Sequence, residues 1–166
     1  MDANKAEPNA TTTERISDRE LLVTRMVNAP ARIVFAAWTK PDLVMRWWTP
    51  KSFGITLLSC EIDARTGGSY RYVFGHPAAP EPMAFFGRYT DVIPNARLVW
   101  TNEESDQGPI STATFEDKDG MTLLEVHELY PSKEALDEAL ASGSTGAWPE
   151  QFTELDALVA DPHVAV

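Results

Sequence analysis

Cysteine, histidine and long apolar runs are all scarce in this chain of 166 residues. Its single cysteine, Cys60, cannot form an internal disulfide, and a lone thiol is typical of proteins from a reducing compartment. No apolar run approaches the roughly 18 residues that span a bilayer, and the polar N-terminus lacks the apolar core of a secretory signal. We therefore expect a cytoplasmic protein that does not bind a membrane.

The scarcity of histidine and cysteine also limits the chemistry that we expect. His76, His127 and His163 lie far apart in the sequence, and no group of His and Cys has the spacing of metal ligands. Cys60 lies among apolar residues, which indicates a buried thiol rather than a nucleophile. The pair Gly67-Gly68 lacks the pattern of a phosphate-binding loop. These residues predict no metal site, no cofactor and no recognisable catalytic group.

Positive charge is almost missing from the second half of the chain. Residues 103–166 hold 2 Lys and Arg against 15 Asp and Glu, whereas residues 1–102 hold 12 against 10. The net charge of −11 argues against nucleic acid as a partner. We interpret the acidic half as a solvated face; a basic protein partner and packing against the basic half are the alternatives.

The chain does have an apolar fraction of 43% and enough length for one core. Residues 1–19 hold few large apolar side chains and predict a flexible N-terminal tail. Residues 20–160 predict a single domain, and residues 161–166 predict a short C-terminal tail.

Prolines delimit two short helices near the start of this domain. A strand is expected over 20–27, and Pro30 then suits the first position of a helix with Asn28 or Ala29 as its cap. Pro41 begins the second helix, which ends at Pro50.

Alternating patterns predict the rest of an α+β fold. The spacing of a final apolar stripe predicts a C-terminal helical region, with Ser132 as its cap and Gly143 and Gly146 as interruptions. Between the helices we expect strands at 55–63, 69–74, 85–93, 97–102, 110–116 and 121–130.

Several short patterns occur in an order that is found in a known superfamily. They are Arg25 to Pro30, Val34-Phe35-Ala36-Ala37-Trp38-Thr39-Lys40-Pro41, Trp47-Trp48-Thr49-Pro50, Asp63-Ala64-Arg65-Thr66-Gly67-Gly68-Ser69-Tyr70-Arg71, Gly87-Arg88-Tyr89 and Gly146-Ala147-Trp148 before Leu155. In this order they resemble the START-like helix-grip (SRPBCC, Bet v-like) superfamily over roughly residues 20–160. Within it they are most similar to the branch of the activator of heat-shock protein 90 ATPase, which is related to polyketide-cyclase-like proteins.

The resemblance implies a curved antiparallel sheet of about six or seven strands that wraps a long C-terminal helix, with two short helices after the first strand. It also implies a cavity between the sheet and the helices. Members of the superfamily bind or transform hydrophobic molecules, and others bind chaperones. The chain departs from the pattern at Thr49, where a glycine is expected, and at Ala147, which separates Gly146 from Trp148.

Aromatic residues of these elements are the candidates for the lining of that cavity, and core packing is the alternative for each of them. The candidate ligand-binding residues are Trp38, Trp48, Phe53, Tyr70, Tyr72, Phe74, Phe85, Tyr89, Trp100, Phe115, His127, Trp148 and Phe152.

A ligand in such a cavity needs a polar anchor. A ligand that buries about 250 Å² of apolar surface gains about 6 kcal/mol, of which association costs at least about 4 kcal/mol. Alternation puts Tyr70 and Tyr72 on one face of their strand and Arg71 on the other, and it leaves open which face is inward. The candidate anchors are Arg71, Arg88, Tyr70, Tyr72, Tyr89, Glu125 and His127.

Three functions are compatible with these patterns. The favoured one is binding of a small hydrophobic or aromatic molecule without chemistry. The second is a cyclase- or hydrolase-like enzyme, in which His127 beside Glu125 or a tyrosine acts as acid or base; a polar pair on the outer face is the alternative interpretation of His127. The third is a chaperone-binding module. Whether the chain forms a homodimer is left open.

Overall fold

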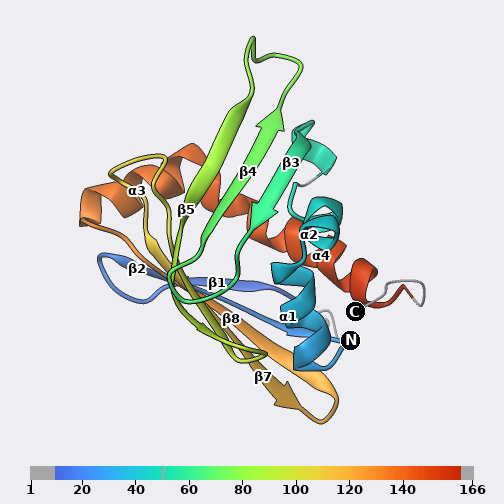
Figure 1. The fold of residues 1–166 in the computed structure, drawn as a ribbon. Helices are drawn as coiled ribbons and strands as arrows, with labels where there is room; N and C mark the ends of the chain where they lie inside the picture. The colour runs from blue at the N-terminus through green and yellow to red at the C-terminus, as the bar shows by residue number, and fades with distance from the viewer. Residues whose placement is uncertain (1–9, 50, 162–166) are drawn as a thin grey trace, which may run out of the picture.

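One antiparallel sheet, curved around a C-terminal helix, organises the computed structural model, which describes residues 10–49 and 51–161 (Figure 1). In chain order the strands are β1 (Thr12–Arg15), β2 (Glu20–Val27), β3 (Thr56–Ile62), β4 (Ser69–Gly75), β5 (Met83–Ile93), β6 (Arg97–Thr101), β7 (Ile110–Lys118) and β8 (Met121–Leu129). They lie side by side in the order β1-β2-β8-β7-β6-β5-β4-β3. The expected α+β helix-grip fold is confirmed, with eight strands rather than six or seven.

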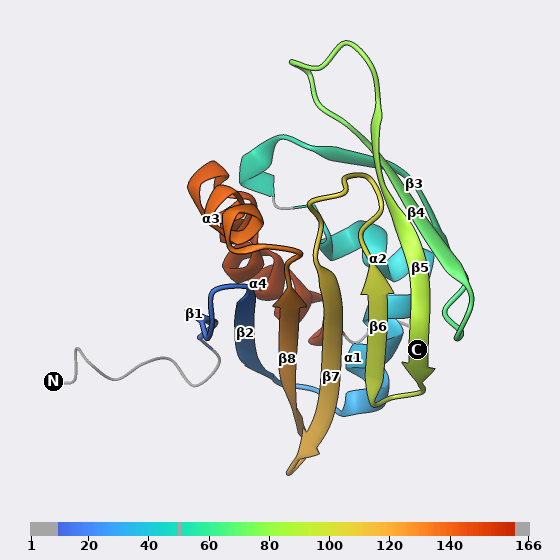
Figure 2. The same cartoon turned by 90° about the vertical axis from the view of Figure 1, so that its left-hand side faces the viewer.

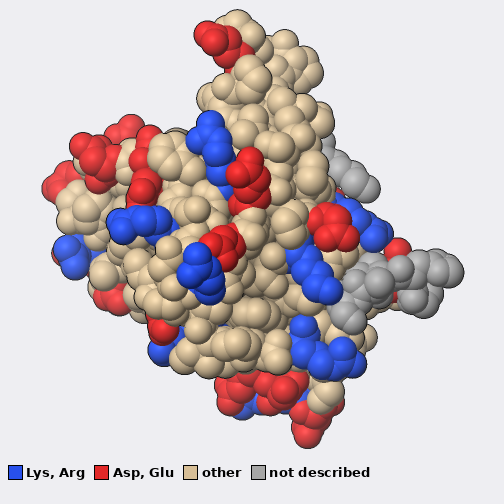
Figure 3. Space-filling view, in the orientation of Figure 1, with Lys and Arg blue, Asp and Glu red and all other residues tan. Residues whose placement is uncertain are grey.

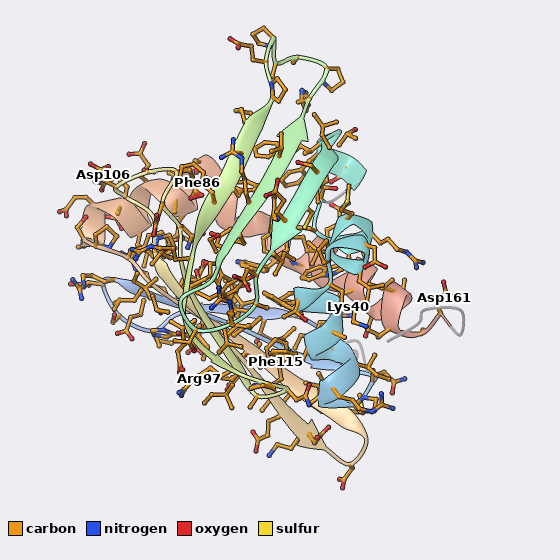
Figure 4. The ribbon with its side chains drawn as sticks, viewed as in Figure 1. Lys40, Phe86, Arg97, Asp106, Phe115 and Asp161 are labelled. Carbon is orange, nitrogen blue, oxygen red and sulfur yellow. The ribbon has the colours of Figure 1, made fainter. Side chains whose placement is uncertain are left out.

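The two helices expected after the first strand are confirmed as α1 (Ala31–Thr39) and α2 (Pro41–Trp47), which meet at Lys40 (Figure 4). They pack together because their apolar faces are buried, and the Trp47 indole N–H donates to the Ala37 carbonyl at 2.8 Å. Both helices lie against the same face of the sheet as the C-terminal helix (Figure 2). None of the described helices is long and apolar enough to cross a membrane.

The expected cap of α1 is wrong. Pro30 itself occupies the N-cap position, where it has no side-chain hydrogen bond to offer. The free N–H of Ala31 is instead satisfied by Asp117 of β7, whose Oδ1 accepts at 2.8 Å. A residue distant in sequence therefore caps this helix, and local sequence patterns carry no sign of it.

The expected flexible tail is also wrong for part of its length. Residues 12–15 form β1, which pairs with β2 in the register Thr12↔Thr24 to Arg15↔Leu21. All four side chains are exposed, so this strand is held by backbone hydrogen bonds and has no apolar signal. Residues 1–9 of the expected N-terminal tail and 162–166 of the expected C-terminal tail lie outside the described residues.

The C-terminal region is two helices rather than one long helix. Ser132 accepts from the Ala135 N–H at 3.0 Å and begins α3 (Lys133–Ser142), as expected. Gly143, with φ of 79°, ends it in the left-handed conformation that glycine adopts readily. A 3₁₀ turn (Ser144–Ala147) then leads into α4 (Trp148–Val159), the helix that the sheet holds.

The sheet bends sharply within β5. Residues 83–88 of this strand pair with β4 and residues 89–93 pair with β6, with a shift in register after Tyr89. Figure 1 shows β3, β4 and the first part of β5 turned away from β2, β8 and β7. At the bend a Cβ atom on Gly87 would lie 2.1 Å from the Thr101 carbonyl oxygen, so only glycine allows β6 to approach this closely.

A buried ion pair fixes α4 to the sheet. Arg25 of β2 is 8% exposed, and its Nη2 lies 2.7 Å from Oδ2 of Asp156 in α4. The other guanidinium nitrogen, Nη1, donates to the Thr11 hydroxyl at 3.0 Å. Loss of either partner leaves a charge with little access to water, which is costly.

We expect Asp156→Ala to lower the free energy of unfolding by about 3 kcal/mol, because the buried Arg25 guanidinium loses its counter-charge. Urea denaturation measures this. The exposed pair Lys133–Asp137 is the control, and Lys133→Ala should change stability little. Equal losses in the two variants would contradict the structural role of the buried pair, and the double variant Arg25→Met/Asp156→Leu should recover much of the lost stability.

We expect Gly87→Ala to destabilise the fold by about 3 kcal/mol, because the Thr101 carbonyl must move to admit the methyl group. Gly75→Ala is the matched control, since a Cβ there meets only the Leu58 side chain, at 3.4 Å. Thermal unfolding of both variants tests the prediction, and a Gly87→Ala protein as stable as wild type would refute the proposed cause of the bend.

Candidate functional site

A cavity of about 390 Å³ lies between the concave face of the sheet and helices α1, α2 and α4. Phe53 and Phe85, 41% and 36% exposed, are its most exposed large apolar side chains and mark its mouth. The lining is formed by Trp38, Trp48, Thr49, Phe53, Ile55, Tyr70, Tyr72, Phe85, Tyr89, Leu98, Trp100, Asn102, Glu104, Pro109, Glu128, Tyr130, Ala147, Trp148 and Gln151.

Tryptophans from three helical segments form one wall of the cavity. Trp38 of α1 stacks against Trp148 of α4 with ring centroids 6.3 Å apart, and it meets the edge of Trp48 at 5.9 Å. Trp48 in turn lies edge-on to Tyr72 of β4 at 5.3 Å. The helices and the sheet therefore touch through aromatic rings, whose rigid faces leave space between them.

A buried carboxyl lies at the polar end of the cavity. Glu128 of β8 is 8% exposed and lines the cavity. Its Oε2 accepts from the Ser111 hydroxyl at 3.1 Å, its Oε1 accepts from Tyr130 at 3.5 Å, and Trp148 also donates to it. Burial raises the pKa of Glu128 above its usual value, although these three hydrogen bonds act in the opposite direction.

A second group of polar atoms lies next to Glu128. The Asn102 amide donates to the Ser111 hydroxyl at 3.1 Å and to the Pro109 carbonyl at 2.7 Å, and so extends the network. Glu104 accepts from the Phe86 N–H at 3.3 Å, and burial raises the pKa of Glu104. The cavity thus has an aromatic part and an acidic, hydrogen-bonding part.

The cavity tyrosines stay protonated at neutral pH. Burial raises the pKa of Tyr70, Tyr72, Tyr89 and Tyr130 well above the ordinary value. The Tyr70 hydroxyl donates to the Thr101 carbonyl at 2.7 Å, and the side chains of Tyr72 and Tyr89 form a hydrogen bond with each other. They serve as hydrogen-bonding groups rather than as bases.

The structure brings together nine of the thirteen candidate binding residues. Their role in binding stays a prediction. The nine that line the cavity are Trp38, Trp48, Phe53, Tyr70, Tyr72, Phe85, Tyr89, Trp100 and Trp148.

Three other candidates pack in the core behind the lining. Phe74 stacks on Phe85 at 4.6 Å. Phe115 of β7 lies edge-on to Phe35 of α1 at 5.4 Å (Figure 4), and Phe152 is fully buried against Trp148. For these three residues core packing, the alternative that the sequence left open, is what the structure shows.

His127, the last candidate, lies on the outer face of β8. Residues 122, 124, 126 and 128 of this strand are buried, so His127 and Glu125 point the other way. His127 Nε2 lies 2.7 Å from Glu20 of the neighbouring strand β2. The interpretation as an outer polar pair is therefore correct, and this histidine cannot act on a molecule in the cavity.

The charged anchors proposed from the sequence also face outward. Alternation leaves Arg71 and Arg88 exposed, with Arg71 5.7 Å above the Phe86 ring and Arg88 paired with Glu103 at 2.8 Å. Burial raises the pKa of Cys60 to about 12, in line with a thiol that is not a nucleophile. Among the described residues no group of three or more His, Cys, Asp or Glu could hold a metal ion.

Sequence reasoning missed the polar end of the cavity. Glu128 follows His127 on β8 and Tyr130 comes directly after the strand; the alternation of apolar residues Leu124 and Val126 places Glu128 on the buried face. The available signal was a carboxylate at a strand position where the alternation predicts an apolar residue. Asn102 and Glu104 lie in a loop, where no repeating pattern indicates which side chains point inward.

The acidic residues of the second half divide into two sets. Most are exposed, among them Glu134 and Glu138 of α3 and Glu116 at the tip of the β7–β8 hairpin, and Figure 3 shows acidic side chains at both places. Glu128, which is buried, and Glu104, which is exposed at the edge of the site, line the cavity.

Comparisons with known proteins agree with this architecture. A structure from Rhodobacter sphaeroides aligns with a TM-score of 0.82 at 24% identity, over 90% of this chain and 97% of that one. A protein from Nitrosomonas europaea aligns at 0.79 and 19% identity, over 88% and 97%. An AHSA1-like protein from Aeromonas hydrophila aligns at 0.67 and 16% identity, over 87% and 99%.

These identities are low, and the likenesses show the fold alone. No curated protein matches this sequence. The profile of one family, described as "Activator of Hsp90 ATPase homolog 1-like protein", matches residues 28–160, which is most of the chain. The protein therefore belongs to the AHSA1-like family, within the START-like (SRPBCC) superfamily that its sequence resembles.

Proposed function

We propose that this protein binds a small hydrophobic or aromatic molecule in the cavity between its sheet and helices. The observation that carries the proposal is the lining itself, in which tryptophan, tyrosine and phenylalanine rings surround a space of about 390 Å³. Such a volume lies within the range of about 300–1,000 Å³ that ligand pockets occupy.

The polar end supports the proposal. Apolar contact alone binds weakly, because association consumes most of the gain from a small buried area. Glu128 and Asn102 supply the fixed hydrogen-bonding groups that orient a ligand and add affinity. An acid–base role inside the cavity would fall to Glu128 rather than to His127, since His127 faces away.

A larger residue at position 147 should block the cavity. Ala147 lines it, so we expect Ala147→Phe to weaken binding of the neutral dye N-phenyl-1-naphthylamine at least about tenfold, which corresponds to about 1.4 kcal/mol. Dye fluorescence and the shift in melting temperature measure binding. Ala157→Phe, at an exposed position of α4, is the matched control and should bind as wild type does. Equal binding by the two variants, or no binding by wild type, would count against the proposal.

The buried carboxyl should cost stability at neutral pH, as expected of a group that serves binding rather than folding. The pKa of Glu128 is raised in the folded state, so between its unfolded and folded pKa values the native protein retains a proton that the unfolded chain has lost. The free energy of unfolding therefore falls as pH rises through this window and is level above it.

We expect the melting temperature of Glu128→Gln, relative to wild type, to increase as pH rises from about 4.5 through the folded pKa of this group. Circular dichroism melts across pH 4.5 to about 8 measure the difference. Glu103→Gln is the control, because hydrogen bonds from Thr101 and Arg88 lower the pKa of Glu103, so its effect on stability changes below this pH range and the difference should stay level within it. A difference for Glu128→Gln that falls with pH would refute the account.

A further inference from the structure

The charge of the cavity lining is of one sign only. Glu104 and Glu128 are its ionisable carboxyls, and no Lys, Arg or His is among the described residues that line it. The basic side chains of the neighbouring strands point outward, as Arg71 and Arg88 do. An anionic ligand would therefore meet two carboxyl groups and no counter-charge.

Glu128 is surrounded by neutral donors. Ser111, Tyr130 and Trp148 each donate to it, yet among the described residues no basic side chain forms an ion pair with it. His127 lies on the same strand but pairs with Glu20 across the other face. A carboxylate buried in this way lacks the countercharge that normally offsets its desolvation.

The aromatic part of the cavity, like the unpaired carboxylate, favours a positively charged ligand. The face of a tryptophan or tyrosine ring carries negative potential and attracts a cation that has left water. Trp148 both lines the cavity and donates its indole N–H to Glu128, so the edge of this ring lies next to the carboxyl. Trp38 and Trp48 complete this wall.

We propose that the cavity selects hydrophobic organic cations, with the ammonium group held between Glu128 and the aromatic rings of the lining. This inference rests on the proposed binding function and specifies the class of its ligand. An alkyl or aryl group attached to the nitrogen fills the apolar part of the cavity, which extends to Phe53 and Phe85 at the mouth.

Binding of such a cation is linked to a proton. The titratable groups facing Glu128 are Tyr70 of β4, Tyr130 and the nearby Glu104, with His127 behind the strand. The tyrosines are already protonated and cannot take up a further proton. At a pH where the Glu128 carboxyl still holds its proton, entry of the cation releases that proton, and affinity increases with pH up to the pKa of this group.

Three probes of nearly the same shape test the charge preference on the wild-type protein: phenyltrimethylammonium, the neutral tert-butylbenzene and the anionic benzenesulfonate. The first is permanently charged, so its own titration does not interfere. We expect it to bind at least as tightly as tert-butylbenzene and at least about tenfold more tightly than benzenesulfonate. Calorimetry in buffers of different ionisation enthalpy, at a pH where Glu128 still holds its proton, should show proton release for the cation alone.

The variant Glu128→Gln keeps the shape of the side chain and removes its charge. It should weaken phenyltrimethylammonium at least about tenfold and leave tert-butylbenzene within about twofold, while Glu103→Gln, outside the cavity, should change neither. Tighter binding of the neutral or anionic probe by wild type would overturn the charge preference alone. If wild type binds none of the three probes, the charge preference is also overturned. Binding of N-phenyl-1-naphthylamine then decides whether the proposed function fails as well.

Discussion

The close approach of β6 to Gly87 is the constraint on which the rest of the structure depends. Since no side chain fits between Gly87 and the Thr101 carbonyl, β5 can leave one half of the sheet and join the other within a few residues. The bend turns β3 and β4 over the helices, so the concave face is deeper than α4 alone can fill. The cavity is thus a result of strand geometry, and the aromatic residues line a space that the backbone creates.

The two buried polar centres differ in how their charge is balanced. Arg25 has a carboxylate partner at 2.7 Å and joins β2 to α4. Glu128 has hydrogen bonds from neutral groups only, and burial raises its pKa. The first centre stabilises the fold, whereas the second lowers stability at neutral pH and lies where a ligand could supply what is missing.

Most of the fold could be predicted from the sequence, because proline positions, alternation and the apolar stripe are local signals. The helices between Pro30 and Pro50, the strands from β2 to β8 and the cap at Ser132 all follow from them. The features that were missed have no apolar pattern that marks them in the sequence. Strand β1 is held by backbone hydrogen bonds without an apolar face, and α1 is capped by Asp117 from a hairpin some 86 residues away.

The site was predicted in part for the same reason. Aromatic residues could be assigned to a cavity by their position in the sheet, and the three tyrosines among the candidate anchors line it. The charged candidates and the histidine, such as Arg71 and His127, face outward. The apolar residues of β8 alternate with polar ones and so indicate which face of the strand is buried. This pattern would have identified Glu128 as a residue of the buried face. Thr49 and Ala147, where the sequence departs from the expected pattern, both line the cavity.

Two contacts tie the C-terminal end of α2 to both ends of α4. The Gln151 amide donates to the Trp48 carbonyl at one end, and Arg46 pairs with Asp161 at 3.0 Å at the other. The tryptophan wall is therefore a fixed floor, while the strands opposite carry the exposed rim residue Phe85. The exposed side of the cavity therefore lies at the β4–β5 hairpin, which Figure 1 shows projecting from the rest of the sheet.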